Sequence, residues 1–301
     1  MSLLVTGSVG IDTVTSPHGN AESVLGGSAV YFSFAASHYV PVRLVGVVGD
    51  DFPDDFRRTL ASRPIDLAGL EVRAGSRTFR WTGRYEGAMN EAETVSVDLN
   101  VLAERGPKVP ASFADSDVVF LANTHPTLQR ELLAQVNHPT LVVCDTMNLW
   151  IANERESLVE SLRQVTGVII NDAEARQLAD RTNLIEAGES ILALGPRFVM
   201  IKKGEHGVML VTPDRAVAIP AFPTKKVCDP TGAGDSFAGG VMGYLAWAGR
   251  HDGETLARAM VRGTVAASFA IEGFSLSRAQ SVTRSEIDGR VDAFLNMLRL
   301  E

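Results

Sequence analysis

The 301-residue chain is predicted to fold as an α/β protein built on a doubly wound, mostly parallel sheet flanked by helices. Two observations predict this class. Short apolar runs alternate with helical segments through the middle of the chain, as in parallel strands joined by right-handed crossovers. The first apolar run, at residues 3–5, leads into Asp12, near the edge where ligands bind in open α/β sheets. The length suits one large domain or two smaller ones.

The individual elements follow from apolar runs, periodicity and capping signals. Predicted strands lie at residues 3–7, 42–48, 79–85, 94–99, 118–121, 141–144, 167–170, 198–201 and 208–211. Predicted helices lie at residues 32–36, 128–136, 157–163, 237–247 and 256–270, with a last helix opened by the capping box of Thr283 and Glu286.

Composition excludes several classes of function. The net charge is −8, without long runs of like charge, so neither a nucleic-acid partner nor an anionic membrane surface is expected. The two cysteines, Cys144 and Cys228, adjoin apolar runs and are typical of core packing in a reducing compartment. With neither a basic leader nor a long apolar stretch, we expect a cytoplasmic protein. The P-loop and Gly-x-Gly-x-x-Gly motifs and histidine ligand spacings are not found.

Residues 229–240 combine a glycine-rich turn, a helix start and an acid. Gly232 and Gly234 allow successive backbone N–H groups to point into one concavity, which holds an anion. The helical periodicity that follows places this turn at a positive helix N-terminus, so phosphate is the expected guest. Asp235 in the first helical turn is placed to accept a proton from a substrate hydroxyl. The alternative is an ordinary first-turn acid behind a tight strand-to-helix turn.

The run Asp-Pro-Thr-Gly-Ala-Gly-Asp-Ser-Phe, followed by Ala-Gly-Gly, resembles the C-terminal signature of the ribokinase-like (PfkB) carbohydrate kinases. This resemblance implies that Gly232, Ala233 and Gly234 form the anion hole for the γ-phosphate of ATP, and that Asp235 deprotonates the accepting hydroxyl. It further implies one kinase domain over residues 1–301, with a small β-sheet lid from segments near 12–25 and 75–105, and use of ATP with Mg²⁺.

The resemblance extends to the N-terminal part of the chain. Asp12 matches a family aspartate that binds sugar hydroxyls, although an aspartate in a loop is often only a turn residue. Gly26 and Gly27 resemble the paired glycines that let the backbone approach the substrate. Tyr31 stands where the sugar-binding asparagine of ribokinase would fall, so it belongs to the expected acceptor site and argues against ribose.

The predicted strand at residues 79–85 falls where the family inserts its lid. Its aromatic face either packs on the body or on a second subunit, which would make a homodimer through the lid, or closes over substrate and stacks on a nucleobase. In the second case Arg84, from the alternate positions, would meet phosphate or hydroxyls.

Other residues are assigned by resemblance to the nucleotide side of the site. Asn171 and Glu174 resemble the Asn-x-x-Glu motif, which binds Mg²⁺ and phosphate through water; a capping box is the structural alternative. Lys203 and Gly204 resemble a segment that borders the nucleotide. Thr231 belongs with the nucleotide-binding turn, and it and Asp229 match residues beside a monovalent-cation site, so K⁺ is a candidate cofactor.

The sequence therefore predicts transfer of the ATP γ-phosphoryl group to a hydroxymethyl group of a sugar, held between Asp12 and Asp235. An adenosine-like or cytidine-like nucleoside is the alternative acceptor. A ligand-sensing protein without turnover is the alternative outside enzymes.

Overall fold

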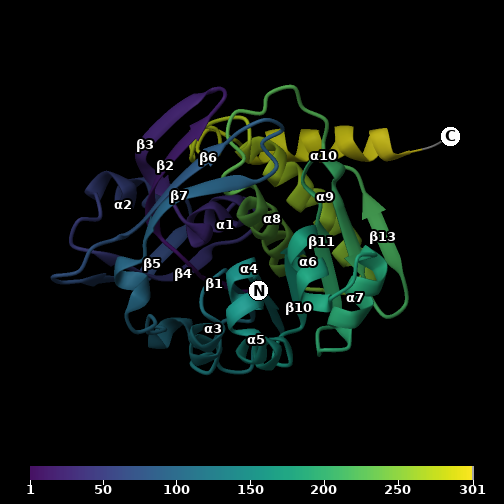
Figure 1. The fold of residues 1–301 in the computed structure, drawn as a ribbon, viewed down its shortest axis with the longest axis horizontal. Coiled ribbons are helices and arrows are strands. Elements are labelled where there is room, and N and C mark those ends of the chain that lie inside the picture. Colours follow the sequence, from purple (N-terminus) through teal and green to yellow (C-terminus); the bar gives the residue numbers. More distant parts are fainter. Residues whose placement is uncertain (300–301) are drawn as a thin grey trace.

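The computed structural model describes residues 1–299, and its centre is a nine-stranded sheet (Figure 1). The strand order is β13-β12-β11-β10-β9-β8-β1-β4-β5, parallel from β11 to β5, with β12 and β13 added antiparallel at one edge. The strands are β1 (Leu3–Thr6), β4 (Val42–Gly49), β5 (Ile65–Arg73), β8 (Val118–Leu121), β9 (Leu141–Cys144), β10 (Gly167–Asn171), β11 (Phe198–Lys202), β12 (Val208–Val211) and β13 (Ala216–Ile219). The predicted doubly wound α/β class is confirmed.

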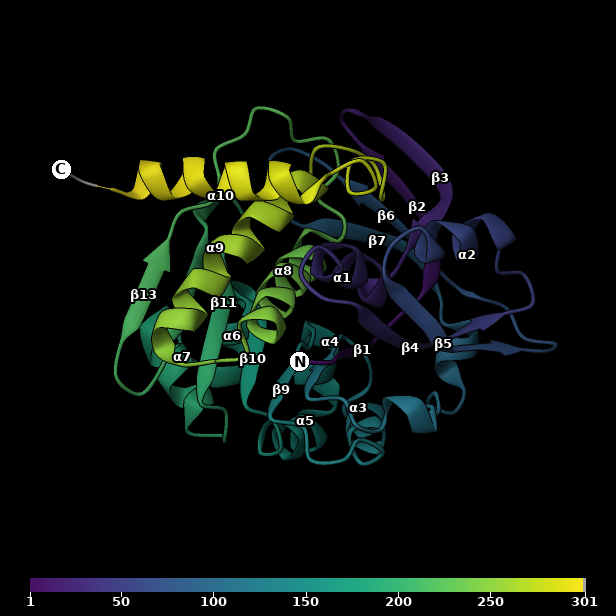
Figure 2. The same cartoon turned by 180° about the vertical axis from the view of Figure 1, so that it is seen from behind.

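Helices cover both faces of this sheet (Figures 1 and 2). The helices are α1 (Ser28–Ala36), α2 (Asp54–Ala61), α3 (Pro126–Leu133), α4 (Asn148–Asn153), α5 (Arg155–Leu162), α6 (Asp172–Ala179), α7 (Leu184–Leu192), α8 (Ala233–Ala248), α9 (Gly253–Ala270) and α10 (Arg284–Leu298). Short 3₁₀ turns are η1 (Asn100–Ala103), η2 (Ala111–Phe113) and η3 (Gly204–His206).

Strand β1 shows why the sheet is buried on both sides. Leu3 and Val5 join one hydrophobic core, which contains residues of α1, α8, α9 and α10. Leu4 points the other way into a second core, which contains residues of α3, α5, α6 and α7. Successive side chains of a strand alternate between faces, so continuous apolar runs are what a sheet covered on both faces requires.

A smaller, four-stranded sheet, the lid sheet, has the order β3-β2-β6-β7. It is built from β2 (Gly10–Ser16), β3 (Gly19–Gly26), β6 (Phe79–Tyr85) and β7 (Ala92–Asp98), and it lies at one end of the main sheet (Figure 1). Strands β2 and β6 pair in parallel, whereas both outer pairings are antiparallel, so the sheet is mixed.

Helix α8 lies unusually close to α1. A Cβ atom at Gly239 would stand 2.3 Å from the Phe32 carbonyl oxygen, and one at Gly243 would stand 2.8 Å from Ala36 Cα. Glycine is therefore required for this backbone approach. The contact fixes the start of α8 relative to α1 and to β3, the lid strand that directly precedes α1.

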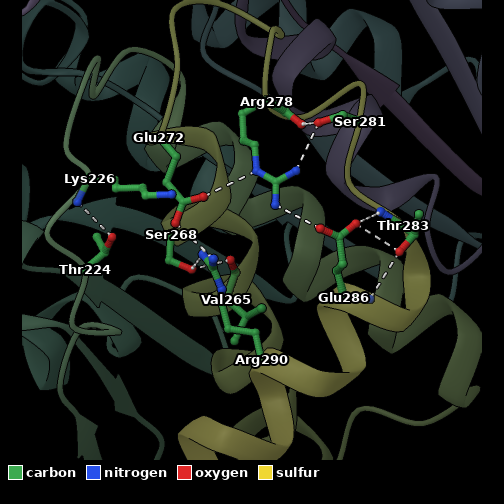
Figure 3. A network of polar contacts seen from close by, with 10 residues as sticks. All are labelled: Thr224, Lys226, Val265, Ser268, Glu272, Arg278, Ser281, Thr283, Glu286 and Arg290. Carbon is green, nitrogen blue, oxygen red and sulfur yellow. Dashed lines mark hydrogen bonds and ion pairs between the residues drawn. The ribbon is translucent and has the colours of Figure 1, made fainter.

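The last helix is held by a polar network around Arg278 (Figure 3). Thr283 and Glu286 form the capping box predicted for α10. Arg278 bonds both Glu286 and Glu272, and Arg290 reaches Glu272 from α10 at 2.9 Å. Glu272 begins the loop after α9, so this network ties that loop to α10.

Among residues 1–299, no helix combines the length and apolar character needed to cross a bilayer.

Candidate active site

The sequence-predicted acceptor and catalytic residues converge on one pocket of about 310 Å³. Its walls come from the lid sheet, from the carboxyl ends of central strands and from the start of α8, where ligands of open α/β folds bind. The predicted residues that line it are Asp12, Gly27, Tyr31, Glu174, Thr231, Gly232, Gly234 and Asp235. Lining residues that were not assigned from sequence are Ser8, Ser28, Phe79, Trp81, Asn123, Asp145, Thr146, Met147 and Lys202.

The glycine-rich turn opens α8 as expected. Gly232 has φ +73°, a left-handed conformation, and Ala233 is the first helical residue. Asp235 lies in the first turn of α8. Burial, reinforced by Asp145 and offset by Lys202, raises the pKa of Asp235 to about 7. A carboxyl group with a pKa near neutrality suits proton transfer at physiological pH.

Gly232 is glycine for a second reason, which involves Tyr31. A Cβ atom at Gly232 would stand 2.2 Å from Tyr31 Cγ, so the aromatic ring packs directly against the turn. Tyr31 is 2% exposed, and its hydroxyl has no hydrogen-bond partner within the described chain. The Tyr31 side chain therefore supports the turn, and its buried hydroxyl lies beside the pocket.

Asp12 lies on β2 and is 3% exposed. Its carboxylate occupies the space above Gly26, where a Cβ atom would stand 1.8 Å from Asp12 Oδ2. Gly27 has φ +103° and leads into α1. Burial, with smaller repulsion from Asp229 and Asp235, raises the pKa of Asp12 to about 7. In residues 1–299 its Oδ1 atom lacks a hydrogen-bond partner, as expected of an acceptor awaiting a ligand hydroxyl.

The Asp229 carboxylate holds the glycine-rich turn in place by accepting two backbone hydrogen bonds. Asp229 is fully buried, and its carboxylate accepts the backbone N–H of Thr231 at 2.9 Å and that of Ser275 at 3.3 Å. The Thr231 hydroxyl donates to the Tyr85 hydroxyl on β6 at 3.3 Å. The catalytic turn, the loop after α9 and the lid sheet therefore meet at Asp229 and Thr231.

Asn171 and Glu174 form a complete capping box at the start of α6. Glu174 Oε2 accepts the Asn171 backbone N–H at 2.7 Å, and the Asn171 side chain accepts the Glu174 backbone N–H at 2.8 Å. Burial, followed by repulsion from Asp145, raises the pKa of Glu174 to about 7. Glu174 also lines the pocket, so the capping role does not remove it from the site.

Lys202 lines the pocket, whereas the sequence predicted that its neighbour Lys203 borders the nucleotide. It is the last residue of β11 and pairs in register with Asn171 on β10. Burial opposes the charged form, but Asp145, Glu174 and Asp235 together raise the pKa of the Lys202 ammonium group. Strand alternation could have separated Lys202 from Lys203, because adjacent residues of a strand point to opposite faces.

Seven predicted residues lie outside the pocket lining: Gly26, Arg84, Asn171, Lys203, Gly204, Asp229 and Ala233. Arg84 on β6 is about half exposed and approaches Glu93 of β7 at 3.8 Å. Lys203 and Gly204 lie just beyond β11, where Gly204 has φ +54°. Beside them, Asn90 from the turn between β6 and β7 donates to Glu205 at 3.2 Å, so the tip of the lid sheet touches this segment. Their assignment to ligand contact remains a prediction.

The aromatic face of β6 divides between two roles. Phe79 and Trp81 line the pocket, whereas Tyr85 packs with Val14 and Met89 in a small core of the lid sheet.

Within residues 1–299, no cluster of three or more His, Cys, Asp or Glu side chains could hold a metal ion.

Comparisons with known proteins agree with this geometry. The pfkB family carbohydrate kinase profile matches residues 12–281. A cytidine kinase from Thermococcus kodakarensis is 30% identical over 81% of this chain and 88% of its own length. Among solved structures, a Burkholderia thailandensis nucleoside kinase in complex with inosine has TM-score 0.78 at 19% identity, covering 98% of this chain and 99% of its own. Ribokinase II of E. coli, in complex with ATP and Mg²⁺, has TM-score 0.78 at 17% identity, covering 97% and 99%.

The chain therefore belongs to the PfkB family of carbohydrate kinases, phosphotransferases with an alcohol group as acceptor, and has the ribokinase-like fold.

Because the pKa of Asp235 is raised, we predict that this residue makes folding stability depend on pH. A folded-state pKa of about 7 against an ordinary value of 3.8 means that the folded protein prefers the protonated carboxyl. This contribution to stability is complete below the ordinary pKa and is lost as pH rises through about 7. The stability advantage of Asp235→Asn, which stays neutral, over wild type should therefore be ~1–3 kcal/mol larger at pH 8 than at pH 5.

Urea denaturation of the ligand-free protein at both pH values measures this difference. Asp214→Asn, at an exposed position, is the matched control and should show no such pH-dependent gain. An equal effect of Asp235→Asn at the two pH values would contradict the prediction.

Proposed function

We propose that this protein transfers the γ-phosphoryl group of ATP to the hydroxymethyl group of a nucleoside. The observation that carries the proposal is the shared pocket, in which Asp235 stands at the N-terminus of α8 and Asp12 faces the same cavity from the lid sheet. In this proposal Asp235 is the proton acceptor, the glycine turn binds the anion and Asp12 binds a hydroxyl, and all three line one pocket.

Each group of pocket residues has its own role in the proposed reaction. Asp235 in its ionised form accepts the proton of the attacking hydroxyl. Backbone N–H groups at Gly232, Ala233 and Gly234 stabilise the negative charge on the phosphoryl oxygens, helped by the α8 dipole. Asp12 and the Gly26–Gly27 backbone orient the sugar hydroxyls, and Phe79 and Trp81 exclude water from above.

The residues present fit Mg²⁺ and ATP. Glu174 uses one carboxylate oxygen in its capping bond, and its other oxygen has no hydrogen bond to the described residues, so it can hold a metal-bound water. When bound, Mg²⁺ would neutralise charge on the β- and γ-phosphates. Asn171, Lys203 and Gly204 remain assigned to the nucleotide side, and Asp229 and Thr231 to a candidate K⁺ site. These assignments rest on family resemblance.

The acceptor side of the pocket favours a nucleoside. Trp150 donates its indole N–H to Asn123 Oδ1 at 3.0 Å, and an indole N–H can only donate. The Asn123 NH₂ group must therefore face the other way, toward Met147 Sδ at 3.1 Å and the pocket. A fixed amide donor, with Trp81 available for stacking, suits a ring nitrogen or carbonyl oxygen of a nucleobase. Similarity to a cytidine kinase supports the same choice.

A free sugar with a hydroxymethyl group is the second candidate acceptor. It is favoured by Asp12, whose unpartnered Oδ1 can bind a sugar hydroxyl whether or not a base is attached. Arg84 would contact hydroxyls only if the lid sheet moved. A sensing role without turnover is disfavoured because the glycine turn and Asp235 are both intact and both line the pocket.

Replacing the proposed base gives the direct test of kinase chemistry. Asp235→Asn should lower turnover by at least ~100-fold, because proton transfer is lost, while ATP affinity stays within about twofold. In wild type, kcat/KM should fall about tenfold per pH unit below about 7, where the Asp235 carboxyl becomes protonated. ADP release and ATP titration calorimetry measure the two quantities. Near-normal turnover of the variant would refute the assigned role.

An acceptor panel separates nucleosides from free sugars. We expect phosphorylation of one or more nucleosides and none of free pentoses or hexoses. Asn123→Leu should lower kcat/KM for the preferred nucleoside by about 10-fold to 100-fold, mainly through KM, because one hydrogen bond to the base is lost. Asn137→Leu, at an exposed position, is the control. Activity confined to free sugars would overturn the nucleoside proposal in favour of the second candidate.

We also propose that the lid sheet mediates a homodimer. All seven residues of β7 are exposed, and β7 is an edge strand whose outer backbone groups face no other strand of residues 1–299. Val95, Val97 and Leu99 are each about half exposed along this edge. An exposed edge with apolar side chains favours pairing with a second copy.

Sedimentation velocity tests this association. Wild type should sediment as a dimer, and Val95→Lys combined with Val97→Lys should give a folded monomer, because charge on an edge strand opposes pairing. Met297→Lys, at an exposed site on α10, should leave the dimer unchanged. A monomeric wild type would end the proposal.

A further inference from the structure

We propose that Lys202 is a phosphate-binding residue of the catalytic site, whose ammonium group contacts the γ-phosphoryl group of ATP and stabilises it during transfer. This inference rests on the kinase function proposed above. It gives a specific role to a residue that the sequence motifs left unassigned.

The topology places Lys202 at the sheet edge that forms the pocket, beside the end of β10. Strands β9, β10 and β11 are adjacent and parallel, so their carboxyl ends lie side by side. Asp145 follows the end of β9, Asn171 ends β10, and Lys202 ends β11. The Lys202 side chain therefore lies between the Asn171–Glu174 segment and the N-terminus of α8.

The ammonium group reaches the anion-binding turn itself. A Cβ atom at Gly234 would stand 2.9 Å from Lys202 Nζ, and 3.7 Å from Cε. Nζ is therefore packed against the same short segment whose backbone N–H groups face the phosphoryl position.

The ammonium group also has no structural partner. Within residues 1–299, Lys202 Nζ makes no side-chain hydrogen bond and no ion pair within 4.0 Å. The carboxylates of Asp145, Glu174 and Asp235 act on it through space and favour its charged form. Of the residues that line the pocket in the described chain, Lys202 alone is a Lys or Arg. A half-buried cation that lines a pocket and has no protein partner for its donors is a binding group for an anion.

The chemical step defines what Lys202 would do. The bond between the γ-phosphorus and the β,γ-bridging oxygen breaks, and its electron pair stays on the β-phosphate of ADP. A bond forms between the γ-phosphorus and the acceptor oxygen, and the proton of that hydroxyl passes to Asp235. Lys202 and the turn N–H groups share the charge on the three equatorial phosphoryl oxygens throughout. No further reactant is needed.

A merely structural role makes a different prediction. If Lys202 only balanced the charge of the neighbouring carboxylates, its loss would alter stability and weaken Mg·ATP and Mg·ADP alike. A γ-phosphoryl contact discriminates, because only a nucleotide with three phosphates can make it.

Titration calorimetry with Mg·AMP-PNP and Mg·ADP provides the test. Lys202→Met should weaken AMP-PNP binding by about 10-fold or more and leave ADP binding within about twofold. Lys202→Arg should retain much of the AMP-PNP preference, since it keeps a cation at the site. Lys108→Met, which removes an exposed lysine, should match wild type for both nucleotides. Turnover of Lys202→Met should fall by about 100-fold or more.

Each contrary outcome distinguishes a failure of the Lys202 role from a failure of the kinase function. Equal weakening of both nucleotides, or wild-type binding of both, would overturn the role of Lys202 while leaving the kinase function standing through the Asp235→Asn result. Absence of nucleotide binding and turnover in wild type would overturn both. Thermal melting checks that the variants fold; if Lys202→Met does not, Lys202→Gln is compared by the same ratio of AMP-PNP to ADP affinity.

Discussion

The site depends on the buried carboxylate of Asp229. Its two backbone acceptor bonds join the catalytic turn at Thr231 to the loop at Ser275, which comes from a segment 46 residues further along the chain. That loop is in turn anchored to α10 through Glu272 and its two arginines. The conformation of the turn is therefore set by contacts that extend to the C-terminal helix, well outside the pocket.

Charge balance is the second constraint. Asp12, Asp145, Glu174 and Asp235 all contribute to one pocket with one lysine, and burial raises the pKa of each carboxyl group. Water can solvate only the open side of such a cluster, so the ligand-free pocket retains protons near neutral pH. A bound metal ion or a basic group reverses that preference. The burial that raises the pKa of Asp235 therefore also makes its ionisation depend on what else occupies the pocket.

Much of this arrangement was accessible from sequence, for identifiable reasons. The strands at 118–121, 141–144 and 208–211 have the predicted bounds because each is a short apolar run with polar or glycine residues close to both ends. The glycine turn and Asp235 are contiguous, so one motif carries them. Lys202 and Asn123 were missed because their roles depend on strand order and on a distant tryptophan. Helix α4 was missed because six residues carry too little periodicity.

The contact between Tyr31 and Gly232 has an evolutionary consequence. The ring that lines the pocket also fills the volume beneath the glycine turn. A smaller residue at position 31 would enlarge the acceptor site and at the same time remove the support of the turn, whereas any side chain at position 232 would collide with the ring. Drift at either position is therefore constrained by the other. Substitutions at positions 31 and 232 are therefore sterically linked, because each residue sets the space open to the other.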